Sequence, residues 1–135
     1  MKHSVFFLVL ALVTIASTSC RETLDERLSR ESKEFTKRYC PKQIDPNVVL
    51  DSVTYSPVSE NEKAYEYHYS VRGDSSTIET LKQYESMLRE GHQKGIRNTP
   101  ELKIIRDNGI PLRYIYRLQG KKKPFMEFSF DEEDY

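Results

Sequence analysis

The stretch Ala64-Tyr-Glu-Tyr-His-Tyr-Ser-Val-Arg72 decides the fold of this chain. Its aromatic and aliphatic side chains, from Tyr65 to Val71, alternate with polar side chains, from Glu66 to Arg72. Successive side chains of a β-strand point to opposite faces of the sheet, so this period of two predicts a strand with a buried, tyrosine-rich face and a polar face.

Further strands are expected on both sides of this stretch. Residues 48–55 form a partner strand, because the turn-rich segment 57–61 links the two as a hairpin. Residues 110–118 and 125–130 form a second hairpin around Gly120 and three lysines. The core face of its first strand is expected to consist of Leu112, Tyr114, Tyr116 and Leu118.

Apolar residues recur at helical spacing before and between the two hairpins. Residues 25–39 form the first predicted helix, which Pro41 ends, and residues 78–91 form the second, which Gly91 should end. A short helix follows from Thr99 to Gly109, and residues 41–47 are expected to form a loop. The order helix, strand, strand, helix, strand, strand predicts an α+β fold, a single four-stranded antiparallel sheet with helices packed on one face.

Length and charge limit the possible functions. A chain of 135 residues has room for one domain, and 21 basic against 21 acidic residues give a net charge of zero. Nucleic-acid binding is therefore not expected, because it relies on a strong excess of positive charge.

The N-terminus has the pattern of an export signal. A basic start is followed by the apolar run Val5–Ile15, which is too short to span a bilayer, and by the small residues 16–19. Small residues directly before Cys20 resemble the lipobox of bacterial lipoproteins, in which this cysteine is acylated. We therefore expect residues 1–19 to be a signal peptide, with Cys20 the lipid anchor. The alternatives are a plain secreted protein with an ordinary thiol at Cys20 and an uncleaved N-terminal anchor.

This reading divides the chain into four parts. After the signal peptide come residues 20–24 as the lipidated N-terminus and tether, residues 25–130 as the α+β domain, and residues 131–135 as an acidic tail. The anchor would place the protein in the cell envelope, on the outer rather than the inner membrane.

Several stretches together resemble small uncharacterised exported proteins of Gram-negative bacteria, many of them lipoproteins. The stretches that carry this resemblance are Cys40-Pro-Lys-Gln-Ile-Asp45, Leu50-Asp-Ser-Val53, Tyr67-His-Tyr69, Asn98-Thr-Pro-Glu-Leu102 and Asn108-Gly-Ile-Pro-Leu-Arg-Tyr-Ile-Tyr-Arg117. The resemblance covers nearly the whole mature domain and implies no established activity.

The polar face of the predicted sheet is the candidate binding surface. Arginine is enriched there, and its planar guanidinium suits carboxylate or phosphate groups and protein interfaces. The other interpretation is an ordinary solvated face with cross-strand charge pairs. The residues of this candidate surface are Glu66, His68, Arg72, Arg113, Arg117 and Glu127.

Signals for catalysis are weak. With Cys20 acylated, Cys40 is the one remaining thiol, and it is expected to be buried, paired with another molecule or reactive. The histidines left in the mature chain are His68 and His92, and no metal-ligand spacing occurs, so neither a metal nor a cofactor is expected.

We therefore expect a lipid-anchored, non-catalytic binding or accessory module of the cell envelope. Its partners would be the membrane, through the anchor, and an unidentified envelope protein. Two alternatives stay open, namely an inhibitor or immunity-type protein for a toxic enzyme and a small envelope enzyme that uses Cys40 or His68.

Overall fold

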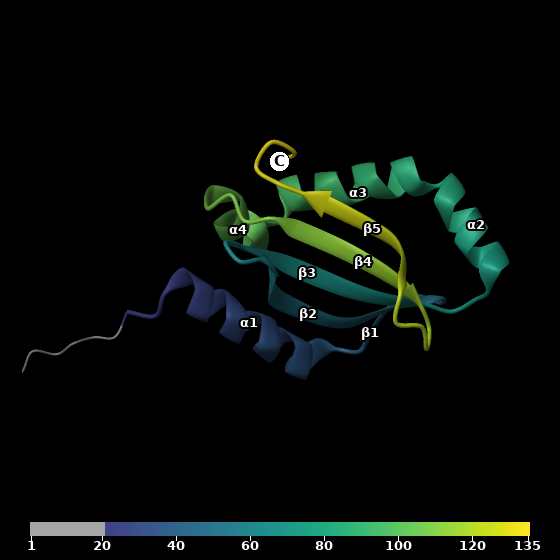
Figure 1. Ribbon diagram of the computed structural model, residues 1–135, viewed down its shortest axis with the longest axis horizontal. Helices are drawn as coiled ribbons and strands as arrows, with labels where there is room; N and C mark the ends of the chain where they lie inside the picture. The colour runs from purple at the N-terminus through teal and green to yellow at the C-terminus, as the bar shows by residue number, and fades with distance from the viewer. Residues whose placement is uncertain (1–20) are drawn as a thin grey trace, which may run out of the picture.

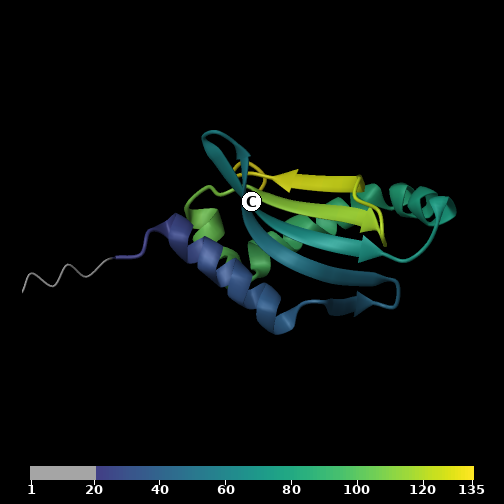
Figure 2. The same ribbon diagram turned by 60° about the horizontal axis from the view of Figure 1, so that its bottom comes forward.

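The computed structural model describes residues 21–135, so the predicted signal peptide and Cys20 lie outside the described residues. The chain folds into one sheet with helices (Figures 1 and 2). In chain order the elements are α1 (Leu24–Tyr39), β1 (Lys42–Asp45), β2 (Val48–Ser59), β3 (Glu62–Val71), α2 (Ser75–Gln83), α3 (Glu85–Asn98), η1 (Pro100–Leu102), α4 (Lys103–Asp107), β4 (Leu112–Leu118) and β5 (Pro124–Phe130).

The sheet has five strands in the order β1-β2-β3-β4-β5. Neighbouring strands are antiparallel except for β3 and β4, which run parallel with Tyr65 beside Leu112 and Val71 beside Leu118. The α+β class and both predicted hairpins are confirmed. The expectation of four strands, all antiparallel, is wrong. The sheet has five strands, and the pair β3 and β4 is parallel.

Two features explain this difference. Residues 42–45, expected in a loop, form the edge strand β1, whose side chains are all exposed and therefore carry no alternating pattern. The connection between β3 and β4 carries all the helices that follow the first hairpin. A connection of this length can return the chain to the end of the sheet where β3 began, so that β4 runs parallel to β3.

Helix α1 matches the predicted helix and has clear end signals. Thr23 forms a capping box with Glu26, in which the Thr23 hydroxyl accepts the Glu26 backbone N–H and the Glu26 carboxylate accepts the Thr23 N–H. Ser32, which interrupts the apolar stripe, is buried and donates its hydroxyl hydrogen to the carbonyl of Ser29.

The second predicted helix is wrong at its C-terminal end. The helical segment breaks at Tyr84 into α2 and α3, and α3 continues past Gly91 and Gly95 to Asn98. Glycine in a helix interior costs only about 1 kcal/mol. The packing of Leu88 and of the fully buried Ile96 against the core offsets this cost.

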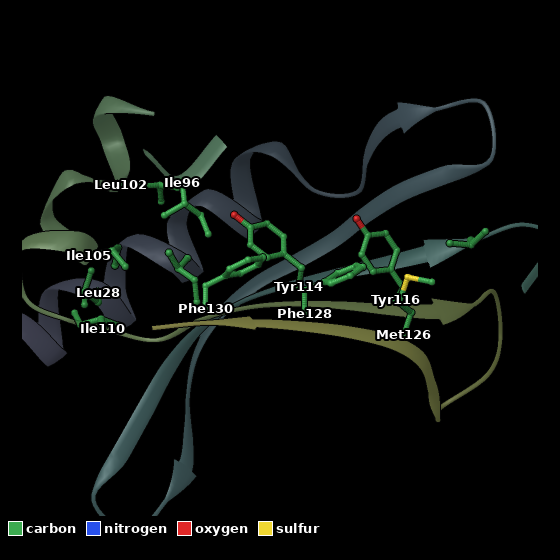
Figure 3. Close-up of a cluster of buried hydrophobic side chains, with 12 residues drawn as sticks. Leu28, Ile96, Leu102, Ile105, Ile110, Tyr114, Tyr116, Met126, Phe128 and Phe130 are labelled. Carbon is green, nitrogen blue, oxygen red and sulfur yellow. The ribbon is translucent and has the colours of Figure 1, made fainter. Parts of the chain in front are cut away.

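The core lies between the sheet and the helices (Figure 3). Leu28 of α1 and Ile105 of α4 belong to one buried cluster with Phe128 and Phe130 of β5. The predicted core face of β4 is confirmed for Leu112, Tyr114 and Tyr116, which are buried, whereas Leu118 at the strand end is only half-buried. α1, α3 and α4 all contribute side chains to this one cluster, and the predicted helices on one face are confirmed.

The last five residues pack against α3. The carbonyl of Asp134 accepts hydrogen bonds from Gln93 and Arg97, and the Tyr135 hydroxyl donates to the carbonyl of Ile110. The acidic side chains from 131 to 133 are exposed. No helix within residues 21–135 has the length and hydropathy needed to cross a membrane.

Candidate functional site

We call the side of the sheet that faces away from α1 and α3 the open face. Its side chains come from every second residue of β3 and β4, which lie side by side in register. Glu66 neighbours Arg113, His68 neighbours Ile115, and Ser70 neighbours Arg117. Across the next strand pair, Glu127 of β5 lies beside Ile115. The structure therefore places five of the six predicted residues together on the open face, namely Glu66, His68, Arg113, Arg117 and Glu127.

Arg113 is fixed between two carboxylates. Its Nη1 donates to Glu66 Oε2 at 2.5 Å, and its Nη2 donates to Glu127 Oε1. Glu66 is only 6% exposed, and a buried carboxylate is costly unless it is paired. The row Glu66-Arg113-Glu127 therefore crosses three strands as one connected ion-pair network.

His68 is held by hydrogen bonds on both ring nitrogens. Its Nδ1 lies 3.1 Å from Arg117 Nη1, and its Nε2 lies 2.9 Å from Thr54 Oγ1. A guanidinium can only donate, so Nδ1 accepts and Nε2 carries the proton that Thr54 accepts. Burial lowers the pKa of His68, and the nearby Arg117 and Arg113 lower it further against the opposing effect of Glu66. His68 is therefore a neutral, positioned side chain at pH 7.

Arg117 joins this network to the β4–β5 turn. Its Nε donates to the carbonyl of Lys122 at 2.9 Å, while its Nη1 donates to His68. Between these polar residues Ile115 is only 3% exposed, although it lies on the open face. The side chains of the open face thus form a packed polar layer over this isoleucine.

Arg72, the sixth predicted residue, lies just beyond the end of β3. Its side chain is exposed and forms no ion pair with the part of the chain that the structure describes. It lines a shallow depression of about 480 Å³ at one corner of the sheet, which we call the Arg72 recess. The residues of the recess are Pro41, Gln43, Val49, Asp51, Ser70, Arg72 and Gln119.

A second depression borders the opposite end of the open face. The β2–β3 hairpin bends to the side away from the helices (Figure 3). Val58 and Glu62 of this hairpin line a hollow of about 340 Å³ together with Arg113 and Ser129. The open face is therefore bounded by a hollow at each end.

Sequence reasoning missed the contribution of β2 to this face. Thr54 holds His68, and Asp51 accepts a hydrogen bond from Ser70, but neither residue was singled out. The signal that could have found them is the β2–β3 register, which places Thr54 beside Glu66 and Ser52 beside His68.

Cys40 and His68 do not form a catalytic pair in the described residues, since no hydrogen bond joins them. Burial raises the pKa of the Cys40 thiol, and Asp51 raises it further, whereas a nucleophilic cysteine requires a lowered pKa. Within residues 21–135 no group of three or more His, Cys, Asp or Glu side chains is arranged to hold a metal ion.

His92, the other histidine of the domain, lies on the opposite side of the sheet among aromatic side chains. Its ring stacks on Tyr114 with 3.9 Å between centroids, and its Nε2 lies 2.7 Å from the Tyr116 hydroxyl. Burial lowers the pKa of His92 to about 4. This histidine is therefore a neutral, half-buried residue on the helix side of the sheet rather than part of the open face.

Comparison with known proteins adds a family and a fold relative. A search of curated proteins found no match. The crystal structure of a presumed secreted protein from Pseudomonas aeruginosa, at 1.60 Å resolution, has a similar fold, with a TM-score of 0.62. It is 19% identical in sequence, and the match covers 83% of this chain and 96% of that one. The model of a domain of unknown function, DUF8479, matches residues 23–126. The chain therefore belongs to the DUF8479 family.

Proposed function

We propose that this protein is a lipid-anchored, non-catalytic module of the cell envelope that binds a partner protein through the open face. The observation that carries the proposal is the Glu66-Arg113-Glu127 row, a fixed array of charges on the side of the sheet that α1 and α3 leave uncovered. Interfaces gain specificity from charged groups that are held in place before the partner arrives.

The start of the folded domain supports the anchor. The capping box at Thr23 begins α1 only three residues after Cys20. Three extended residues span about 10 Å at most. Acyl chains on Cys20 would therefore hold the domain close to the membrane surface, and two or more chains suffice for stable attachment.

An exported location agrees with the relative of similar fold, which is described as a presumed secreted protein. It also agrees with the signal-like N-terminus, in which an apolar run and small residues precede Cys20. We propose the outer membrane as the site of attachment.

A binding role fits the chemistry of the open face better than catalysis does. Both nitrogens of His68 are engaged, by Thr54 and by Arg117, which leaves no basic lone pair for proton abstraction. The Cys40 thiol has a raised pKa and no histidine partner among the described residues. The arrangement therefore favours recognition over reaction.

The test is affinity capture of the tagged, exported protein from bacterial envelopes, with mass spectrometry of its N-terminus. Ser129→Arg would place a long side chain on the open face without removing a member of the ion-pair row, because Ser129 is exposed beside Arg113. Ser86→Arg on α3 is the matched control, since it introduces the same side chain at an exposed site away from the face. We expect a diacylated or triacylated Cys20 and a companion protein that Ser129→Arg abolishes and Ser86→Arg retains. An unmodified N-terminus contradicts the anchor, and companions that ignore Ser129→Arg contradict the binding face.

A further inference from the structure

We propose that the Arg72 recess binds a carboxylate side chain in an acidic, partly apolar peptide segment of the partner protein. This inference deepens the proposed function and rests on it, because the recess is a corner of the open face. It assigns the chemical class of the partner, which the ion-pair row alone does not.

The donors of the recess are available for a ligand. Arg113 is occupied by two carboxylates and Arg117 by His68 and a carbonyl, but the Arg72 guanidinium has no such partner in residues 21–135. Its planar fork can donate two parallel hydrogen bonds to one carboxylate. The Gln119 side-chain amide lines the same recess and also makes no hydrogen bond within the described residues.

The charge around the recess favours an anion. The β4–β5 turn carries Lys121, Lys122 and Lys123, all exposed and without an ion pair in the described part of the chain. This turn adjoins the recess, because Gln119 N–H donates to the carbonyl of Val71, directly before Arg72. In a chain with zero net charge, this corner therefore concentrates positive charge that attracts acidic groups.

Asp51 is the carboxylate inside the recess, and its hydrogen bond is to Ser70 rather than to Arg72. Its Oδ2 accepts a hydrogen bond from the Ser70 hydroxyl across the β2–β3 pair. No ion pair joins Asp51 to Arg72 in residues 21–135. Arg72 therefore remains open to an external carboxylate.

The apolar part of the recess favours a peptide over a small anion. Pro41 and Val49 form part of its wall. β1 is an edge strand whose outer side pairs with no strand of residues 21–135. An extended peptide can pair with such an edge and place its apolar side chains on these residues. Inorganic phosphate can use only the cationic part of the site.

The position of the recess argues against a lipid headgroup of the anchoring membrane. α1 begins next to the tether and ends at Tyr39, and Pro41 of the recess follows two residues later. A helix of 16 residues is about 24 Å long. The recess therefore lies at the opposite end of α1 from Leu24, where the helix begins.

The experiment measures fluorescence anisotropy of a labelled, N-acetylated and C-amidated peptide of alternating glutamate and valine. The protein is the exported chain, purified from envelopes in detergent with its native N-terminus. Arg72→Glu is the test variant, and Lys94→Glu is the control because it makes the same change of charge at an exposed site on α3. A glutamine–valine peptide, inorganic phosphate and vesicles with anionic phospholipid serve as competitors.

We expect the glutamate–valine peptide to bind, with Arg72→Glu weakening its Kd roughly tenfold to a hundredfold, as expected for the loss of charge-assisted hydrogen bonds. Lys94→Glu should leave the Kd within about twofold, and the glutamine–valine peptide should not compete. Absence of binding, or equal weakening by both variants, overturns the inference. Competition by phosphate or anionic vesicles at least as strong as that by unlabelled glutamate–valine peptide reassigns the recess to a free anion or a headgroup. If an envelope companion still depends on Ser129 while Arg72→Glu leaves peptide binding intact, only this inference fails and the proposed function stands.

Discussion

Lowering the pH from 7.5 to 5 should remove about 2 kcal/mol from the free energy of unfolding through His92 alone. The neutral ring of this histidine is half-buried against aromatic side chains of the core, with Tyr69, Tyr114, Tyr116 and Phe128 as its neighbours. None of these neighbours carries a charge at these pH values that could stabilise an imidazolium. Protonation of His92 therefore favours the unfolded chain.

The magnitude follows from the two pKa values. Burial lowers the pKa of His92 from 6.5 to about 4. Because the folded pKa lies below the unfolded one, stability is independent of this group above pH 6.5. It then falls by about 1.4 kcal/mol per pH unit until the pH approaches the folded pKa. Carboxylates with lowered pKa values in the folded protein, such as that of Asp74, reduce the stability only at lower pH. They remain ionised in both states until the pH falls toward 3.8, the pKa of Asp74 in the unfolded chain.

The assay is urea unfolding at pH 7.5, 6.5, 5.5 and 5.0, followed by circular dichroism. His92→Phe keeps the ring against Tyr114 but cannot titrate, so its stability should change by about 2 kcal/mol less than that of the native protein over this range. Tyr116→Phe removes the hydrogen bond to His92 and should retain the native pH dependence. Parallel pH curves for the native protein and His92→Phe would refute the reasoning.

Three further predictions concern stability, each measured by urea unfolding at pH 7.5. Arg113→Met should lower the free energy of unfolding by about 2–3 kcal/mol because it leaves the buried Glu66 carboxylate unpaired, and adding Glu66→Gln should recover part of that loss. A double variant as unstable as the sum of the two single variants would contradict the coupling between Arg113 and Glu66. Leu28→Ala should lower the free energy of unfolding by about 3 kcal/mol because Leu28 is 2% exposed in the core. Glu34→Ala on the outer side of α1 should change it by less than about 0.5 kcal/mol, and equal effects of the two variants would place α1 outside the core. Gly109→Ala should lower the free energy of unfolding by about 1–2 kcal/mol because Gly109 has a φ of +59° and a Cβ there would lie 2.8 Å from Glu132 Oε2. Gly91→Ala should instead stabilise α3 by about 1 kcal/mol. A stabilising Gly109→Ala together with a destabilising Gly91→Ala would contradict the backbone conformations described for these two glycines.

The sequence predicted the faces of the sheet better than the pairing of its strands. Alternation along β3 and β4 separates Tyr67 and Tyr114 from Glu66 and Arg113, and the structure keeps this division. Strand direction across the long connection from β3 to β4 depends on how far the helices carry the chain, which local patterns do not record. β1 was missed because Lys42–Asp45 is exposed on both sides.

The candidate site was predictable as a set of side chains but not as a network. The period of two places His68 and Arg117 on one face, but their hydrogen bond depends on a parallel register that the sequence reading did not contain. Thr54 was missed because its role arises from pairing across the hairpin rather than from its own residue type. Arg72 was predicted on this face, and the depression beside it forms only when β1 and the loop after β4 come together.

The central claim is that the open face contacts a partner in the envelope, and site-specific photo-crosslinking in living cells tests it most directly. A photoreactive residue replaces Ser129 on the open face or, as the matched control, Ser86 on α3, and both residues are exposed. We predict one discrete protein adduct from position 129 that position 86 does not give. The same adducts from both positions, or an adduct from position 86 only, would contradict the assignment of the open face as the binding surface.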